Sequence, residues 1–121
     1  MYIKSFKELI VWQKAVELAK EVYARTSEFP PRELFGLQSQ MCRSAVSIPS
    51  NIAEGHRRNT KKDFLYFLRI ADGSAAELET QILIAESAHK RINYDKSKEL
   101  LLEVQKMLST VIKKLELNAN R

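Results

Sequence analysis

The residues of this 121-residue chain best suited to chemistry are basic, and they gather in one short stretch. They are Arg57, Arg58, Lys61 and Lys62. Cationic groups at this density bind phosphate, and such binding weakens in salt because it depends on counterion release. His56 and Asn59 could add hydrogen bonds to phosphates or bases. No aromatic residue lies between the basic residues, so the stretch offers no ring on which the bases of a single strand could stack. The alternative interpretation is a solvated loop kept basic for solubility.

Residues for catalysis are hard to find in the sequence. The two histidines, His56 and His89, are expected at opposite ends of the fold, and Cys42 has no local partner. Glu77 and Glu79 lack the histidine that a carboxylate-bridged metal site requires. Zinc, di-iron, P-loop and dinucleotide motifs are absent from the sequence. We therefore expect no enzyme activity, no metal site and no cofactor.

Composition and charge indicate one globular domain spanning residues 1–121. Apolar residues make up 45%, and the net charge is +5. No apolar run approaches the roughly 20 residues that cross a bilayer, and the first residues do not resemble a secretory signal. A single cysteine favours a reducing cytoplasm. Three glycines and three prolines leave few turns, so long helices are expected.

Apolar spacing and capping residues predict four helices, over about residues 5–27, 32–54, 60–90 and 93–117 or 95–117. Ser5 and Glu8 form a capping-box pattern, and Thr60 with Asp63 forms a variant of it. Gly55 is expected to cap the second helix, and Pro49 to bend it. Long helices with short connections favour an all-α, antiparallel up-down-up-down four-helix bundle.

The helices also carry apolar stripes that predict the core. Two stripes form a wide arc on the first helix: one holds Leu9, Trp12, Val16, Ala19 and Tyr23, and the other Val11, Ala15, Leu18 and Val22. The second helix contributes Leu34, Leu37, Met41, Ala45, Ile48 and Ile52, and the fourth Leu101, Val104, Leu108, Val111 and Leu115.

The third helix is apolar most of the way round. Flanks holding Leu65, Ala76 and Leu83, and Tyr66, Ile70 and Ile84, lie beside its core stripe. A single bundle covers only about half of each helix, so these flanks predict a homo-oligomer. Scattered surface apolar residues are the alternative.

Small and polar residues suggest how the second and third helices meet. A polar stripe that includes Arg43, Ser47, Asn51 and Glu54 predicts a hydrogen-bonded seam between helices or subunits. An anion or ligand site at Arg43 and Asn51 is the alternative. Residues 73–76 of the third helix are all small, which could let the bent segment of the second helix at Pro49 pack closely against them.

An antiparallel bundle would gather the net charge at one end. The basic residues expected there are Lys4, Lys7, Arg57, Arg58, Lys61, Lys62, Lys113, Lys114 and Arg121. Four acidic residues oppose these nine: Glu8, Glu54, Asp63 and Glu116. The surplus of five equals the charge of the whole chain, and it predicts a nucleic-acid interface at that end.

Several motifs together resemble a known family. They are Trp12-Gln-Lys-Ala15, Phe29-Pro30, Glu33-Leu-Phe-Gly-Leu37, Arg43-Ser-Ala-Val-Ser-Ile-Pro-Ser-Asn-Ile-Ala-Glu-Gly55, Arg58, Asp63-Phe-Leu-Tyr-Phe-Leu68 and Gly73-Ser-x-x-Glu-Leu-Glu-Thr-Gln81. Across nearly the whole chain, this pattern resembles the four-helix-bundle family of 23S rRNA intervening-sequence proteins. Cys42 stands where that family often has a basic residue.

The resemblance implies a bacterial cytoplasmic protein that forms a symmetric ring, a homopentamer. The family is itself similar to the accessory variability protein of diversity-generating retroelements, which is thought to bind nucleic acid. We therefore expect a non-enzymatic ring that binds structured RNA or DNA, such as rRNA, through its basic end. The alternative is a protein-interaction scaffold that uses its apolar helix faces, with no role for nucleic acid.

Overall fold

The computed structural model describes residues 5–119 and contains four long helices and two short 3-10 turns. In chain order they are η1 (Phe6–Glu8), α1 (Ile10–Thr26), η2 (Pro31–Glu33), α2 (Leu37–Arg57), α3 (Lys61–Ala88) and α4 (Asp95–Ala119). No strand occurs within these residues. The predicted all-α class and its four helices are confirmed.

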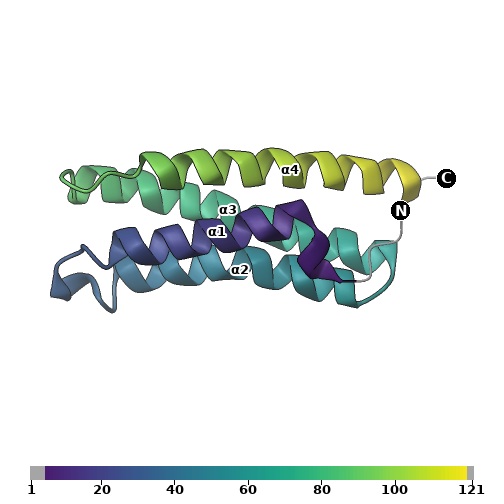
Figure 1. Cartoon of the computed structure of the whole chain (residues 1–121), viewed down its shortest axis with the longest axis horizontal. Coiled ribbons are helices and arrows are strands. Elements are labelled where there is room, and N and C mark those ends of the chain that lie inside the picture. Colours follow the sequence, from purple (N-terminus) through teal and green to yellow (C-terminus); the bar gives the residue numbers. More distant parts are fainter. Residues whose placement is uncertain (1–4, 120–121) are drawn as a thin grey trace.

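The helices pack as a four-membered bundle around a shared core. Each helix contacts two neighbours, so that α1, α2, α3 and α4 follow one another around the bundle and α4 returns to α1. The α1–α2 and α3–α4 connections lie at one end (Figure 1). The α2–α3 connection lies at the other end, together with η1 and the last turn of α4.

Two helices begin later than their sequence patterns predict. The Ser5 hydroxyl accepts a hydrogen bond from the backbone N–H of Lys7, and it therefore caps the short turn η1. Leu9 is extended, with ψ at 124°, so α1 begins only at Ile10. Likewise, residues 31–33 form the separate turn η2, and non-helical Gly36 delays the start of α2 to Leu37.

Gly55 does not end α2, which contradicts its predicted role as a cap. The glycine is buried inside the helix, which continues to Arg57. A Cβ atom at this position would lie 2.8 Å from Cβ of Phe67 and 3.3 Å from Cα of Phe64. The absence of a side chain therefore lets α2 and α3 approach closely. Asn59, with φ at 63°, supplies the left-handed residue after α2 instead.

The second stripe on α1 is fully buried, whereas the first stripe contributes Ala19 to the core and Leu9 and Trp12 to its edge. Val11, Ala15, Leu18 and Val22 are buried, whereas Tyr23 is 55% exposed. The prediction of a buried Tyr23 is therefore wrong, because the helix turns its second stripe inward. Leu34 was also expected in the core, but it precedes α2 and is 51% exposed. The stripe on α4 behaves as predicted at Leu101, Val104 and Leu108, which are buried.

The small residues of α3 meet α2 only in part. Ser74 and Ala75 are buried, and the Ser74 hydroxyl lies 2.8 Å from that of Ser47 on α2. Gly73 is exposed, and a Cβ there would meet nothing within 4 Å. Close approach therefore depends on Gly55 and the small buried residues, and not on Gly73. Pro49 is buried within α2.

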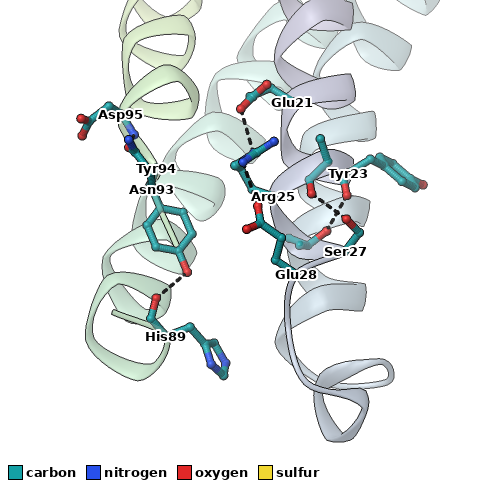
Figure 2. A network of polar contacts seen from close by, with 11 residues as sticks. Glu21, Tyr23, Arg25, Ser27, Glu28, His89, Asn93, Tyr94 and Asp95 are labelled. Atoms are coloured by element: carbon teal, nitrogen blue, oxygen red, sulfur yellow. Dashed lines mark hydrogen bonds and ion pairs between the residues drawn. The ribbon is translucent and has the colours of Figure 1, made fainter. Parts of the chain in front are cut away.

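Polar contacts fasten the end of the bundle opposite the α2–α3 connection. The Tyr94 hydroxyl donates to the carbonyl of His89 at 3.1 Å, and burial raises its pKa to about 12 (Figure 2). Arg25 lies 3.1 Å from Glu21 and 2.8 Å from Glu28 on the neighbouring turns. These contacts order the last turn of α1 and the chain that leads into α4.

Glu33 joins the α1–α2 connection to the end of α3. Its Oε2 lies 2.5 Å from Nε2 of His89, whose ring packs against Phe29 with centroids 4.6 Å apart. The hydrogen bond to His89 is the main cause that lowers the pKa of the Glu33 carboxyl below 4.5. The carboxylate form is therefore the one that the folded chain favours.

Replacement of Gly55 by alanine should destabilise the fold. Overpacking against Phe64 and Phe67 costs about 1–3 kcal/mol, which outweighs about 1 kcal/mol gained in helix propensity. Gly73→Ala is the matched control, because open space surrounds it and it should stabilise the helix by up to about 1 kcal/mol. Urea unfolding of the two variants measures both effects. Equal stabilisation by both substitutions would contradict the close approach at Gly55.

The Glu33–His89 contact should make stability depend on pH in the acid range. A carboxyl with a lowered folded-state pKa contributes stability that is present above its unfolded pKa, near 4.5, and is lost as the pH falls through the folded value. Glu33→Gln should therefore be less stable than the wild type at neutral pH, and the difference should narrow below about pH 4.5. Urea midpoints at several pH values test this. For the control Glu99→Gln, at an exposed position, the difference in stability from the wild type should not change in this way with pH.

Candidate nucleic-acid interface

The basic stretch forms a tight turn between α2 and α3. Arg57 is the last residue of α2, and Lys61 is the first of α3. The Asn59 backbone N–H donates to the His56 carbonyl at 3.4 Å. The Thr60 hydroxyl accepts from the N–H of Asp63 at 3.1 Å, so the predicted cap at Thr60 is confirmed. Two helix ends and a capped turn therefore hold the basic residues in a defined arrangement, which we call the basic turn (residues 57–62).

Arg58 is engaged by the fold itself. Its Nε donates to Oε2 of Glu54 at 2.8 Å, and its guanidinium lies 5.2 Å from the ring centroid of Phe67. The hydrogen bond to Glu54 is the largest cause that raises the pKa of Arg58. Both side chains are about half exposed, so the pair contributes little to stability. Its effect is to orient the Arg58 side chain along α2 and over α3.

The other three basic side chains of the turn face solvent. Arg57, Lys61 and Lys62 are exposed. No acidic side chain within residues 5–119 forms an ion pair with any of them. Lys61 and Lys62 occupy the first turn of α3, where the helix dipole already contributes positive potential. Such a location disfavours lysine and favours a bound anion.

More cations surround this turn at the same end of the bundle. Lys7 in η1 and Lys113 and Lys114 near the end of α4 are exposed, and Figure 1 shows these segments beside the α2–α3 connection. Lys4 and Arg121 lie outside the described residues. Of the acidic residues at this end, Glu116 accepts a hydrogen bond from Arg69 at 2.5 Å, and Glu54 is paired with Arg58. Two of the four negative charges are therefore engaged by arginines.

Part of the predicted polar stripe of α2 lies along the contact with α3. The Asn51 side-chain amide donates to the Ser47 carbonyl at 2.8 Å and to the Ser47 hydroxyl at 3.0 Å, and that hydroxyl contacts Ser74. Arg43 is exposed, and Glu54 is engaged by Arg58. These contacts use both Asn51 N–H donors within the fold. Ser74 is the residue that sequence reasoning did not connect to this seam, because it lies on another helix.

The two histidines lie at opposite ends of the bundle, as the sequence predicts. His56 packs edge-on against Phe64 with centroids 5.8 Å apart, whereas His89 pairs with Glu33 at the other end. The Cys42 thiol lies 3.4 Å from the Thr26 hydroxyl. Within residues 5–119, no three His, Cys, Asp or Glu side chains come together as metal ligands.

None of the helices within residues 5–119 combines the length and the apolar character needed to cross a bilayer.

A family model described as 23S rRNA-intervening sequence protein matches residues 7–111. A crystal structure of a protein of unknown function from the S23 ribosomal protein family of Bacteroides thetaiotaomicron is similar in fold, with a TM-score of 0.72 and 25% sequence identity. That match covers 86% of this chain and 99% of the other. No curated protein matches. The chain belongs to the 23S rRNA-intervening sequence protein family.

Proposed function

We propose that this protein binds structured RNA or DNA through its basic end, as a non-enzymatic helical bundle. The observation that carries the proposal is the basic turn, where Arg57, Lys61 and Lys62 are exposed and have no acidic partner in the described part of the chain. The family name points to rRNA as the first nucleic acid to test. A cytoplasmic location would give the protein access to it.

The chemistry of the turn suits phosphate more than bases. Ammonium groups of Lys61 and Lys62 and the guanidinium of Arg57 supply charge, and the first turn of α3 supplies backbone N–H donors that point out of the helix. Such contacts position a nucleic acid without reading its sequence. The expected preference is therefore for a folded backbone that presents several phosphates together.

We further propose that copies of the chain assemble into a ring. Tyr66, Leu83 and Ile84 on α3 are each more than half exposed, which leaves apolar surface on both flanks of one helix. A ring with all basic ends on one face would multiply the local charge. Five copies are implied by the resemblance. The alternative function, a scaffold for a different protein, would use the same apolar surface without nucleic acid.

Removal of the three unpartnered charges should weaken RNA binding and its salt dependence. For Arg57→Ala/Lys61→Ala/Lys62→Ala, the magnitude of the slope of log affinity against log salt should fall by about 2–3, since each lost phosphate contact removes about 0.7–0.9. Fluorescence anisotropy with a hairpin fragment of 23S rRNA measures this slope.

A control variant separates local charge from net charge. Lys90→Ala/Arg91→Ala/Lys96→Ala removes the same charge from exposed positions at or near the α3–α4 connection, at the opposite end. It should keep most of the affinity. Equal losses of RNA affinity in the two triple variants, or unchanged affinity in the variant of the basic turn, would contradict an interface at that turn. Co-purification of a protein partner without RNA would favour the scaffold.

The wild-type protein should sediment as an oligomer at micromolar concentration. The monomer mass is 14.0 kDa, so equilibrium sedimentation readily distinguishes a ring of several copies from a monomer. Because the association between copies is expected to bury apolar surface, it should persist at salt concentrations high enough to release bound RNA. A monomer under these conditions would contradict the ring.

A further inference from the structure

An exposed apolar pair lies in the connection between α1 and α2. Phe35 is 93% exposed, more than any other large apolar side chain in residues 5–119, and its neighbour Leu34 is 51% exposed. We call these two residues the apolar knob. A solvated phenylalanine beside a second apolar residue is unfavourable in an isolated monomer, and aromatic anchors of this kind are typical of protein interfaces.

The chain around the apolar knob is held firmly. Glu33 immediately precedes it and is hydrogen-bonded to His89, while Phe29 packs on the ring of the same histidine. Two prolines, Pro30 and Pro31, restrict the backbone between these anchors. A preformed knob loses little conformational entropy when it docks, which favours association.

A complementary hollow lies between α3 and α4. Its volume is about 250 Å³, and Ile82, Leu83, Leu101 and Leu102 supply its apolar lining. Leu83 and Leu102 are 59% and 52% exposed, so its walls are unpartnered in the monomer. We call this hollow the α3–α4 groove. It is smaller than the roughly 300–1,000 Å³ of small-molecule sites, and its size suits inserted side chains.

The apolar knob cannot fill the groove of its own chain. The knob lies on the α1–α2 side of the bundle, whereas the groove lies between α3 and α4 on the opposite side. The α1–α2 and α3–α4 connections lie at the same end of the bundle (Figure 1), and the residues of both surfaces lie in or near these connections. Leu83 is five residues from the end of α3, and Leu102 is seven from the start of α4, which places them about 8 and 10 Å along those helices.

This placement distinguishes the α3–α4 groove from a second apolar groove. The second groove has a volume of about 490 Å³ and is lined by Leu9, Ile10, Met107 and Val111, toward the other end of α1 and α4. Docking of the knob there would displace each copy along the bundle axis and extend a filament. Docking in the α3–α4 groove needs a smaller displacement along the axis, about 10 Å, which favours closure of a ring by rotation between copies.

Charge beside the two surfaces is also complementary. Arg32 is exposed two residues before Leu34 and has no ion-pair partner among the described residues. Glu79 lies on the rim of the groove, where its Oε1 accepts from Gln105 at 2.8 Å. Lys98 lies on the same rim, and its charge is paired with Glu86 at 3.0 Å. A copy whose knob entered the groove would bring its guanidinium toward this carboxylate.

We propose that Leu34 and Phe35 of one copy dock into the α3–α4 groove of a second copy of this chain. The contact is heterologous, because each copy offers its knob to one neighbour and its groove to the other. It rests on the proposed ring assembly and names the surfaces that form it. It does not depend on the proposed nucleic-acid binding, which would occur at the opposite end of the bundle.

Disulfide trapping tests which surfaces meet. In a Cys42→Ser background, Leu34→Cys and Leu102→Cys, which keep the Phe35 anchor, are placed in separate chains with different tags, and the chains are co-expressed and oxidised. A covalent heterodimer is expected from the pair, and neither variant alone should cross-link to itself. Leu34→Cys with Ile10→Cys, which probes the second groove, is the matched control. Cross-linking of Leu34→Cys to itself, or preferentially to Ile10→Cys, would overturn the proposal.

Sedimentation tests whether the contact holds the assembly together. Phe35→Ser should weaken association by about thirtyfold or more, the loss typical of a central aromatic anchor. Tyr23→Ser, at an exposed aromatic position on α1, should associate as the wild type does. An assembly that Phe35→Ser leaves intact would overturn the knob contact while the ring remained. A monomeric wild type would overturn both, and RNA binding by the basic turn would still be measured independently.

Discussion

The close approach of α2 to α3 is the constraint on which the rest of the structure depends. It requires a residue without a side chain at Gly55, where a Cβ would lie 2.8 Å from Phe67. The same pair of helices shares the contact between Ser47 and Ser74. Since the two helices are in contact along this length, only the short capped turn at Thr60 is needed to join them. The position of the basic turn therefore follows from the packing of the two helices that it connects.

The fold places the basic turn and the exposed Phe35 toward opposite ends of the bundle. The basic turn joins α2 to α3, whereas Phe35 and the Glu33–His89 pair lie at the end that holds the α1–α2 connection. The proposed nucleic-acid interface and the proposed contact between copies would therefore use different residues.

The accuracy of the sequence predictions depended on how local each interaction is. The cap at Thr60 was correct because hydroxyl and N–H are three residues apart, and the stripe on α4 was correct at Leu101, Val104 and Leu108. Gly55 was misassigned because glycine suits both a helix end and a helix crossing, and only the position of Phe67 distinguishes them. Tyr23 was misassigned because a wide apolar arc does not reveal which half faces the core.

The sequence by itself determined the four helices and the charge that the basic stretch carries, because periodicity, capping and ionisation act within a few residues of the chain. Tertiary structure alone decided which apolar residues of α1 are buried, that Glu33 meets His89 across 56 positions, and that Arg69 on α3 meets Glu116 on α4. These outcomes depend on how whole helices rotate and pack. Packing is a property of the facing surfaces together, and no single segment of the sequence contains it.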